Sequence, residues 1–228
     1  MFYFDWTMLL VLPGLLLGLW AQHRVNSAFS EYSRVHCRRG LRAEEVSAEL
    51  LKQSGNSSVT ITGVSGTLTD HYDPARDTLR LSQSVMGSTS IAAIGVAAHE
   101  CGHAMQQHDG YLPLKLRSAI VPVVNIGSQL YFPIFMAGIL FSWQPLVNIG
   151  ILCFALSLVF SLVTLPVEFD ASRRAVAMLQ SGGYLNEDEL AGARKVLNAA
   201  AMTYVSAVVS SLLQLLRLLL IARSRSDD

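Results

Sequence analysis

Four long apolar segments constrain this chain more than any other feature of its sequence. They cover Met8 to Ala21, about Ala119 to Trp143, Leu146 to Val167 and about Met202 to Ile221. A helix of about 20 apolar residues is long enough to cross the hydrocarbon core of a bilayer. Because a charge-free turn at Ser142 to Pro145 joins the two middle segments, we expect them to form a helical hairpin in the membrane.

The composition of the 228-residue chain agrees with a membrane protein. Hydrophobic residues make up 51% of the sequence and charged residues only 15%, against about 25% charged residues in an ordinary soluble domain. The 17 basic and 17 acidic residues cancel, so the basic excess that binds nucleic-acid phosphates is missing. We therefore expect the lipid bilayer, and no nucleic acid, as a partner. A chain of this length predicts a single domain.

The first and last apolar segments each allow two interpretations. The first could be a signal peptide, but the only charge before it is Asp5 and no A-x-A cleavage site follows, so we favour a retained anchor. The last contains Gln214 and Arg217 and could lie along the membrane surface. We favour a spanning helix there as well.

The polar section between the first two apolar segments predicts a small mixed structure. Helix formers with apolar residues at helical spacing predict a helix over Ala43 to Lys52. β-Branched residues predict strands at Val59 to Thr62 and Thr78 to Ser82, separated by glycines and the turn-like Asp70 to Pro74. Another helix is expected over Ser88 to Gln107. The predicted fold is mainly α, a multi-pass membrane protein with a small α/β part and a short β-sheet.

Lysine and arginine positions predict which parts of the chain face the cytoplasm. The section from His23 to Arg117 carries ten of the 17 basic residues, the segment after Glu168 carries four more, and the hairpin turn carries none. Positive residues are retained in the cytoplasm, so we expect both polar parts there. Arg223 and Arg225 favour the opposite side and leave the side of the C-terminus open.

The three cysteines predict free thiols. Cys37, Cys101 and Cys153 form no CxxC pair, and an odd number cannot complete a disulfide framework. We therefore expect them to face a reducing compartment.

The sequence His99-Glu100-Cys101-Gly102-His103 is an H-E-x-x-H motif on the last helix of the polar section. Spacing of four residues places both imidazoles on one helical face, where they can bind one metal ion. Glu100 projects beside them and can act as a general base toward the attacking water. We expect one Zn²⁺ per chain, with His99 and His103 as ligands and Glu100 as the catalytic base.

A catalytic zinc site needs a third protein ligand and keeps its fourth position for water. Glu168 is the strongest candidate, because it follows an apolar helix expected to end near Pro166, where a lone carboxylate needs a partner. A glutamate that simply faces water at the interface is the alternative. His108 is five positions after His103 and would point about 140° away on a continuous helix, so we do not expect it to be a ligand.

Catalysis also needs a group that stabilises the oxyanion of the tetrahedral intermediate. The candidates are His71, Tyr72, Arg173 and Tyr204, of which we rank His71 and Arg173 first. Each has an ordinary structural interpretation, in the same order a turn histidine, a packed aromatic residue, a solvated arginine and an interfacial tyrosine. The strand at Leu79 to Ser82 could pair with an extended peptide or be an internal strand.

Longer motifs surround these residues and carry a family resemblance. They are Gly66 to Pro74 (GTLTDHYDP), Leu79 to Ser82 (LRLS), Val96 to Gln106 (VAAHECGHAMQ) and Pro166 to Ser172 (PVEFDAS). With them, nearly the whole chain resembles the YugP-type membrane zinc metallopeptidases. That family is similar to HtpX-type and CAAX-processing membrane proteases, whose third ligand is a glutamate after a membrane hairpin. The resemblance implies a gluzincin-like site with Glu168 as the third ligand.

The residues that support the ligands depart from the HtpX-like pattern. Those enzymes have an aspartate four positions after the glutamate, whereas this chain has Ser172 there and Asp170 nearby. Asp170 lies about 200° around a helix from Glu168, so we expect it to support a ligand histidine only if the helix is distorted. A surface or helix-capping aspartate is the alternative.

Together these features predict a zinc-dependent membrane metalloendopeptidase with a zincin-like catalytic part. We expect it in the cell membrane, hydrolysing peptide or membrane-protein substrates at the cytoplasmic face. The single domain would comprise an N-terminal anchor (1–22), a cytoplasmic catalytic part (23–118), a transmembrane hairpin (119–167), a cytoplasmic segment (168–201) and a C-terminal transmembrane helix (202–222).

Two other functions fit parts of the sequence. A site-2-type intramembrane protease would need its motif inside a full spanning helix, but only Ile91 to Ala98 is apolar before the motif and polar residues follow at once. A non-catalytic membrane adaptor with a structural zinc site would need four protein ligands. It would also give no reason for Glu100 between the histidines.

Overall fold

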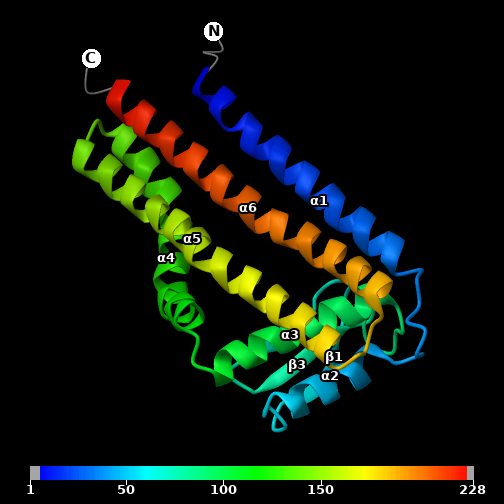
Figure 1. Ribbon diagram of the computed structural model, residues 1–228. Coiled ribbons are helices and arrows are strands. Elements are labelled where there is room, and N and C mark those ends of the chain that lie inside the picture. The colour runs from blue at the N-terminus through cyan, green and yellow to red at the C-terminus, as the bar shows by residue number, and fades with distance from the viewer. Residues whose placement is uncertain (1–5, 225–228) are drawn as a thin grey trace. The chain divides into compact units, whose positions relative to one another are not determined.

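The computed structural model describes residues 6–224 and confirms a mainly α-helical fold with a small β-sheet (Figure 1). Asp5 and Arg225, on which two of the predictions above depend, lie outside the described residues. The elements in chain order are a 3₁₀ helix η1 (Trp6–Leu10), α1 (Leu12–Tyr32), α2 (Ala43–Gln53), β1 (Thr60–Val64), β2 (His71–Asp73), β3 (Thr78–Ser82), α3 (Ile91–His108), α4 (Leu112–Leu140), α5 (Gln144–Ser181) and α6 (Glu187–Ser224).

The chain forms two compact units that are each discontinuous in sequence. The first, the membrane unit, contains Met1–Ala21, Leu116–Leu165 and Thr203–Asp228. The second, the polar unit, contains Gln22–Lys115 and Pro166–Met202. Four helices, α1, α4, α5 and α6, therefore contribute residues to both units.

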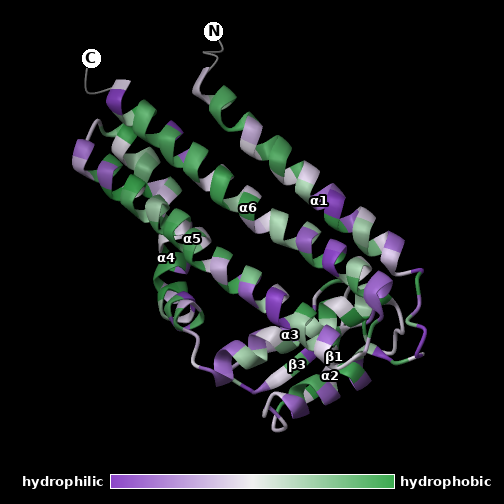
Figure 2. Ribbon diagram, in the orientation of Figure 1, coloured by the Kyte–Doolittle hydropathy of each residue, from purple (hydrophilic) through white to green (hydrophobic). Residues whose placement is uncertain are grey.

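The membrane unit is built from the four apolar segments. All four lie in helices long and apolar enough to cross a membrane, namely Trp6–Tyr32 and the helices α4, α5 and α6, and Figure 2 shows long hydrophobic stretches along them. Their large apolar side chains point outward; Leu140 is 78% exposed and Leu152 65% exposed. Burial of such side chains needs lipid, because the unit itself leaves them uncovered. These features confirm a multi-pass membrane protein.

Close backbone contacts hold the predicted hairpin together. A Cβ added to Gly138 of α4 would lie 2.5 Å from the backbone nitrogen of Val147, and one added to Gly150 of α5 would lie 2.8 Å from Phe135 Cα. Small residues allow such approach between helices in a membrane. In the last helix, the guanidinium of Arg217 donates a hydrogen bond from Nε to the Thr7 hydroxyl at 3.2 Å.

The expected end of the second hairpin helix near Pro166 is wrong, because α5 continues through this proline to Ser181. Proline removes one backbone hydrogen bond and tends to kink a helix, but it does not end the helix when neighbouring contacts hold both sides. The compact units nevertheless divide between Leu165 and Pro166. Glu168 thus lies two residues inside the polar unit on a continuous helix.

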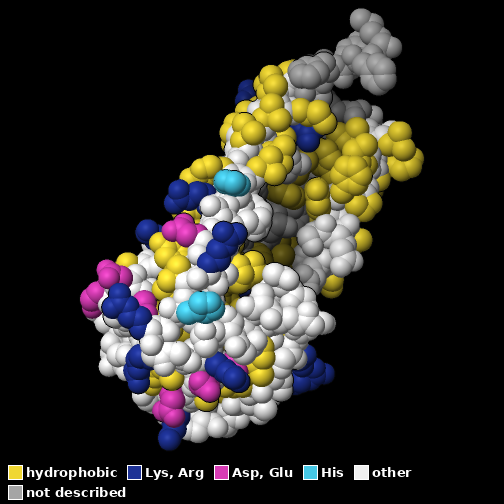
Figure 3. Space-filling view, turned by 90° about the vertical axis from the view of Figure 1, so that its right-hand side faces the viewer, with side chains coloured by type: hydrophobic (Ala, Val, Ile, Leu, Met, Phe, Trp, Pro, Cys, Tyr) yellow, Lys and Arg dark blue, Asp and Glu magenta, His cyan; other side chains and the backbone are white. Residues whose placement is uncertain are grey.

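The core of the polar unit lies between α2, β3, α3 and the parts of α5 and α6 that belong to this unit. It includes the fully buried Leu50, Leu81, Ile94, Leu179 and Leu190. Figure 3 shows charged side chains over the face of this unit and mostly hydrophobic side chains over the face of the membrane unit.

The sheet has the order β1-β3-β2, with β1 parallel and β2 antiparallel to β3. The strand β2 occupies part of the predicted turn Asp70 to Pro74, so that stretch is not wholly a turn. The central strand β3 is paired on both sides, which makes it an internal strand. The edges that could accept an extended peptide belong instead to β1 and β2, each on its side away from β3.

Polar caps set where the helices of the polar unit begin. The α3 helix begins after Ser90, whose hydroxyl accepts a hydrogen bond from Ala93 N at 3.2 Å, as expected for an N-cap serine. An acidic patch, Glu187 to Glu189, forms the first turn of α6. Its third residue, Glu189, is buried rather than solvated and accepts backbone hydrogen bonds from Arg38 and Asn186.

Candidate metal centre

Two histidines of α3 and one glutamate of α5 present their side chains to one point. Nε2 of His99 lies 3.3 Å from Oε2 of Glu168, and Nε2 of His103 lies 3.5 Å from the same oxygen. The three candidate ligand atoms all lie within 4.8 Å of one another. Two imidazoles and a carboxylate are a donor set that zinc takes in catalytic sites. All three residues belong to the polar unit.

The remaining ring nitrogens of the histidines have partners of their own. Nδ1 of His99 lies 3.0 Å from the Ser172 hydroxyl, and Nδ1 of His103 lies 3.0 Å from Oε1 of Gln106. Histidines that bind metals almost always engage their second nitrogen in this way. Each imidazole is therefore held with Nε2 directed toward Glu168, and the residues present fit a zinc ion.

Gly102 allows α3 and α5 to approach closely between the two histidines. A Cβ at this position would lie 2.5 Å from the backbone oxygen of Ala171 and 3.0 Å from its Cα. Backbone atoms cannot move aside as flexible side chains can, so no larger residue fits without separating the helices. The glycine in the motif thus permits the short distance between the histidines and Glu168.

Glu100 is buried beside this cluster. Its Oε2 accepts a hydrogen bond from the backbone N–H of Tyr72 in β2 at 3.0 Å. Burial raises the pKa of the Glu100 carboxyl, while the nearby His103 and His99 oppose this effect. A carboxylate with a raised pKa is better matched to accepting a proton near neutral pH. The contact with Tyr72 also means that the free edge of β2 faces the motif helix.

The other predicted site residues lie in different surroundings. His71 lies in the edge strand β2, with Nδ1 2.8 Å from Thr69 O. Arg173 is five positions after Glu168 in α5, and its guanidinium donates to Asp170. The Tyr72 hydroxyl donates to Asp77 at 2.8 Å. Tyr204 belongs to the membrane unit. The roles of His71 and Arg173 stay predictions.

His108 lies outside the candidate metal cluster. Its side chain is 56% exposed, with Nδ1 3.6 Å from an Asp109 carboxylate oxygen. This agrees with the expectation from helical geometry that His108 points away from His103.

The partners of the histidines explain the departure from the HtpX-like pattern. Ser172, at the position of the expected aspartate, contacts His99 directly. Asp170 contacts neither candidate ligand histidine directly but accepts a hydrogen bond from Gln106, the partner of His103. The helix therefore needs no distortion, because the Gln106 side chain spans the gap. Gln106 is the last residue of the motif VAAHECGHAMQ. Its position about one helical turn after His103 is the sequence feature that could have indicated this role.

A cavity of about 610 Å³ is lined mainly by residues of α5 and α6 in the polar unit. Ser172 lines it, as do Asp170 and Arg173, together with apolar residues of α5 and α6 such as Phe169 and Leu197. The serine that supports His99 thus borders a space with mainly apolar walls.

Comparisons with known proteins show the family to which the chain belongs. The sequence matches the family described as "Putative neutral zinc metallopeptidase" over residues 7–223. It is 43% identical to "Putative membrane protease YugP" of Bacillus subtilis (strain 168) over 219 residues, which cover 96% of this chain and 97% of that protein. No solved structure matches the chain. The chain belongs to this family of neutral zinc metallopeptidases.

Proposed function

We propose that this protein is a zinc-dependent membrane metalloendopeptidase that hydrolyses peptide bonds with Glu100 as general base. The observation that carries the proposal is the convergence of His99, His103 and Glu168 on one point, with Glu100 buried beside them. Three protein ligands leave a coordination position open for water or substrate. Family membership supports the broader part of the proposal, that the protein is a zinc peptidase, independently of the role of Glu100.

The residues divide the chemistry between them. His99, His103 and Glu168 would hold the zinc ion, which would supply Lewis acidity to the scissile carbonyl and to the attacking water. Glu100 accepts the proton of that water and delivers it to the leaving amine. His71 and Arg173 are the candidates for stabilising the oxyanion. His71 can donate a hydrogen bond in its charged or neutral form, and Arg173 donates from its charged guanidinium.

The edge strand β2 is our candidate for holding the substrate backbone. Tyr72 directs its N–H toward Glu100 rather than β3, and in an antiparallel strand the C=O of the same residue points the same way. Because the Tyr72 N–H already donates to Glu100, an extended peptide that adds to this edge would use the Tyr72 C=O as a main-chain acceptor. This arrangement would bring the scissile bond beside the catalytic glutamate.

The two alternatives fit the geometry less well. For a site-2-type protease the motif helix should span the membrane, but α3 is not among the described helices long and apolar enough to do so. For a structural zinc site a fourth ligand is needed, yet within residues 6–224 the cluster contains three candidates. Cys101 cannot be the fourth, because its thiol faces the Ser47 carbonyl oxygen at 3.8 Å.

The first experiment tests peptidase activity and metal removal. Zinc-loaded protein in detergent or liposomes should cleave members of a peptide mixture or of a membrane-protein preparation, with new termini identified by mass spectrometry. A chelator should abolish the cleavage and added zinc should restore it. Cleavage that survives complete removal of the metal would show that the activity does not depend on this site.

The second experiment tests the cytoplasmic location of the site. In a cysteine-free background, single cysteines replace the exposed Arg38, Asp188 and Gln144. An impermeant thiol reagent added to intact cells should label Gln144→Cys in the hairpin turn and spare the other two, which should react only after the cells are opened. Labelling of Arg38→Cys and Asp188→Cys from outside would reverse the proposed orientation.

A further inference from the structure

Gln106 is a fully buried amide whose hydrogen-bond partners come from both α3 and α5. Its exposure is 0%. Nε2 donates to the Val167 carbonyl at 2.8 Å and to an Asp170 carboxylate oxygen at 3.0 Å, while Oε1 lies 3.0 Å from Nδ1 of His103. Buried amides need such partners, since an unsatisfied polar group costs about 1–3 kcal/mol. Gln106 thus joins a candidate ligand to the helix that carries Glu168.

The partners of Gln106 determine which way its amide points. The Val167 carbonyl oxygen can only accept hydrogen bonds, and so can an ionised Asp170 carboxylate. The NH₂ group must therefore face α5, which leaves Oε1 to face His103. An oxygen without hydrogen can only accept, so the hydrogen of this contact must belong to Nδ1 of His103. Nε2 of that imidazole then keeps the lone pair that a metal ligand needs.

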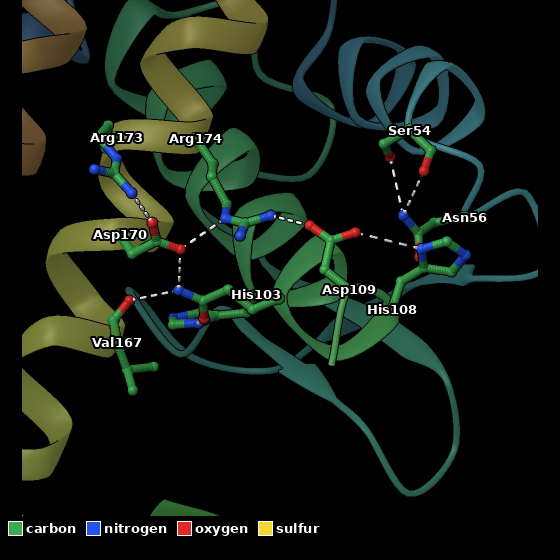
Figure 4. A network of polar contacts seen from close by, with 10 residues as sticks. Ser54, Asn56, His103, His108, Asp109, Val167, Asp170, Arg173 and Arg174 are labelled. Carbon is green, nitrogen blue, oxygen red and sulfur yellow. Dashed lines mark hydrogen bonds and ion pairs between the residues drawn. The ribbon is translucent and has the colours of Figure 1, made fainter. Parts of the chain in front are cut away.

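Two arginines hold Asp170 as the fixed acceptor at the end of this chain. Arg173 and Arg174 both donate to its carboxylate, and this side chain is 4% exposed. Two guanidinium groups favour the ionised form of a carboxylate. Arg174 also donates to Asp109, the residue that follows α3 (Figure 4). The C-terminal end of α3 is therefore bonded to α5 through two residues about one helical turn apart, Gln106 and Asp109.

We propose that Gln106 is a positioning residue that fixes the Nδ1–H tautomer of His103 and its alignment with Glu168. Asp170 and the Val167 carbonyl orient the Gln106 amide, and the amide in turn orients the His103 imidazole. Val167 and Asp170 flank Glu168 in sequence, so one side chain aligns two candidate ligands from different helices. This inference rests on the proposed metal site and extends it to the tautomer and alignment of His103.

The test reverses the donor pattern with little change of shape. Gln106→Glu replaces the NH₂ group by an oxygen, which then faces the Val167 oxygen and the Asp170 carboxylate. Zinc affinity, measured by competition with a chromophoric chelator, should fall about 10- to 100-fold, the range seen when such supporting partners of zinc ligands are changed. Gln107→Glu, at the exposed neighbouring position, adds the same charge one residue away and should leave the affinity within about twofold of the wild type.

A second substitution distinguishes positioning from a general loss of stability. Asp170→Asn, added to Gln106→Glu, supplies an NH₂ group in place of the oxygen that faces Gln106 and Arg174, and this group can donate to the new carboxylate. The remaining amide oxygen still accepts from Arg173. The double variant should bind zinc at least about fivefold more tightly than Gln106→Glu alone. A double variant that binds no better than the single one would overturn the proposed donor chain.

A measurement on the unaltered protein keeps the inference testable if the variants fold poorly. In zinc-loaded protein with ¹⁵N-labelled histidine, long-range proton–nitrogen spectra should show the proton of His103 on Nδ1 and the metal on Nε2. Metal on Nδ1 would overturn the inference. Failure of the wild type to bind zinc would instead refute the proposed function. Equal zinc affinity of the wild type and Gln106→Glu would refute only the role of Gln106.

Discussion

Glu100→Gln should keep zinc near one equivalent per chain while peptide hydrolysis falls by about 10²- to 10⁴-fold, the contribution of general acid–base catalysis. The substitution removes the proton acceptor and keeps nearly the same shape. The amide oxygen can still accept the hydrogen bond from the Tyr72 backbone, which Glu100 accepts at 3.0 Å. Folding and the candidate ligands should therefore be almost unaffected.

The measurement pairs metal content and activity on one purified sample. Zinc is quantified by mass spectrometry, and cleavage is followed on whichever peptide the wild type cuts. Activity close to that of the wild type would remove Glu100 from the mechanism and favour the adaptor interpretation. Loss of zinc with the activity would mean that the carboxylate supports the site rather than acting on the water.

The sequence predicted those parts of the fold and site that depend on local spacing. Four apolar segments predicted the membrane helices, and four-residue spacing predicted that His99 and His103 share a helical face, which their ring-centroid distance of 4.8 Å bears out. The extent of α5 was missed because hydropathy marks where lipid contact ends. Backbone hydrogen bonding can continue past that boundary, through Pro166 into the polar unit.

The support of the candidate ligands depends on contacts between distant segments and could not be predicted. Ser172 and His99 are 73 residues apart, and Gln106 and Asp170 are 64 apart. No periodicity specifies how α3 and α5 pack, so the sequence alone offers only the angle between Asp170 and Glu168 around a helix. The Gln106 side chain bridges Asp170 and His103, so Asp170 can support His103 without a distorted helix. Gly102 was the one local sign of a close approach, because its Cβ position is filled by α5.

The strand β2 was missed because its composition resembles a turn. Aspartate and proline surround His71 and Tyr72 and favour turns in isolation. Pairing with β3 and the contact between Tyr72 N–H and Glu100 outweigh that preference. The three-residue strand thus owes its conformation to the neighbouring strand and helix.

Glu168→Ala should lose zinc about as severely as His103→Ala, because each removes one of three candidate ligands. We expect zinc affinity to fall by more than about 100-fold in both variants, beyond the range for supporting residues. The alanine also leaves the two histidines without the carboxylate that both Nε2 atoms face. Hydrolysis should be lost with the metal in each case.

His108→Ala is the matched control, because it removes an imidazole only five positions after His103. The His108 side chain is 56% exposed and contacts Asp109 rather than the cluster, so this variant should keep full zinc affinity. Glu168→Gln adds a graded test, since its amide oxygen can still bind a metal but carries no negative charge; its affinity should lie between those of the wild type and Glu168→Ala. Full zinc occupancy and activity in Glu168→Ala would exclude Glu168 as a ligand. Metal binding would then not explain why this carboxylate lies beside two histidines at only 2% exposure.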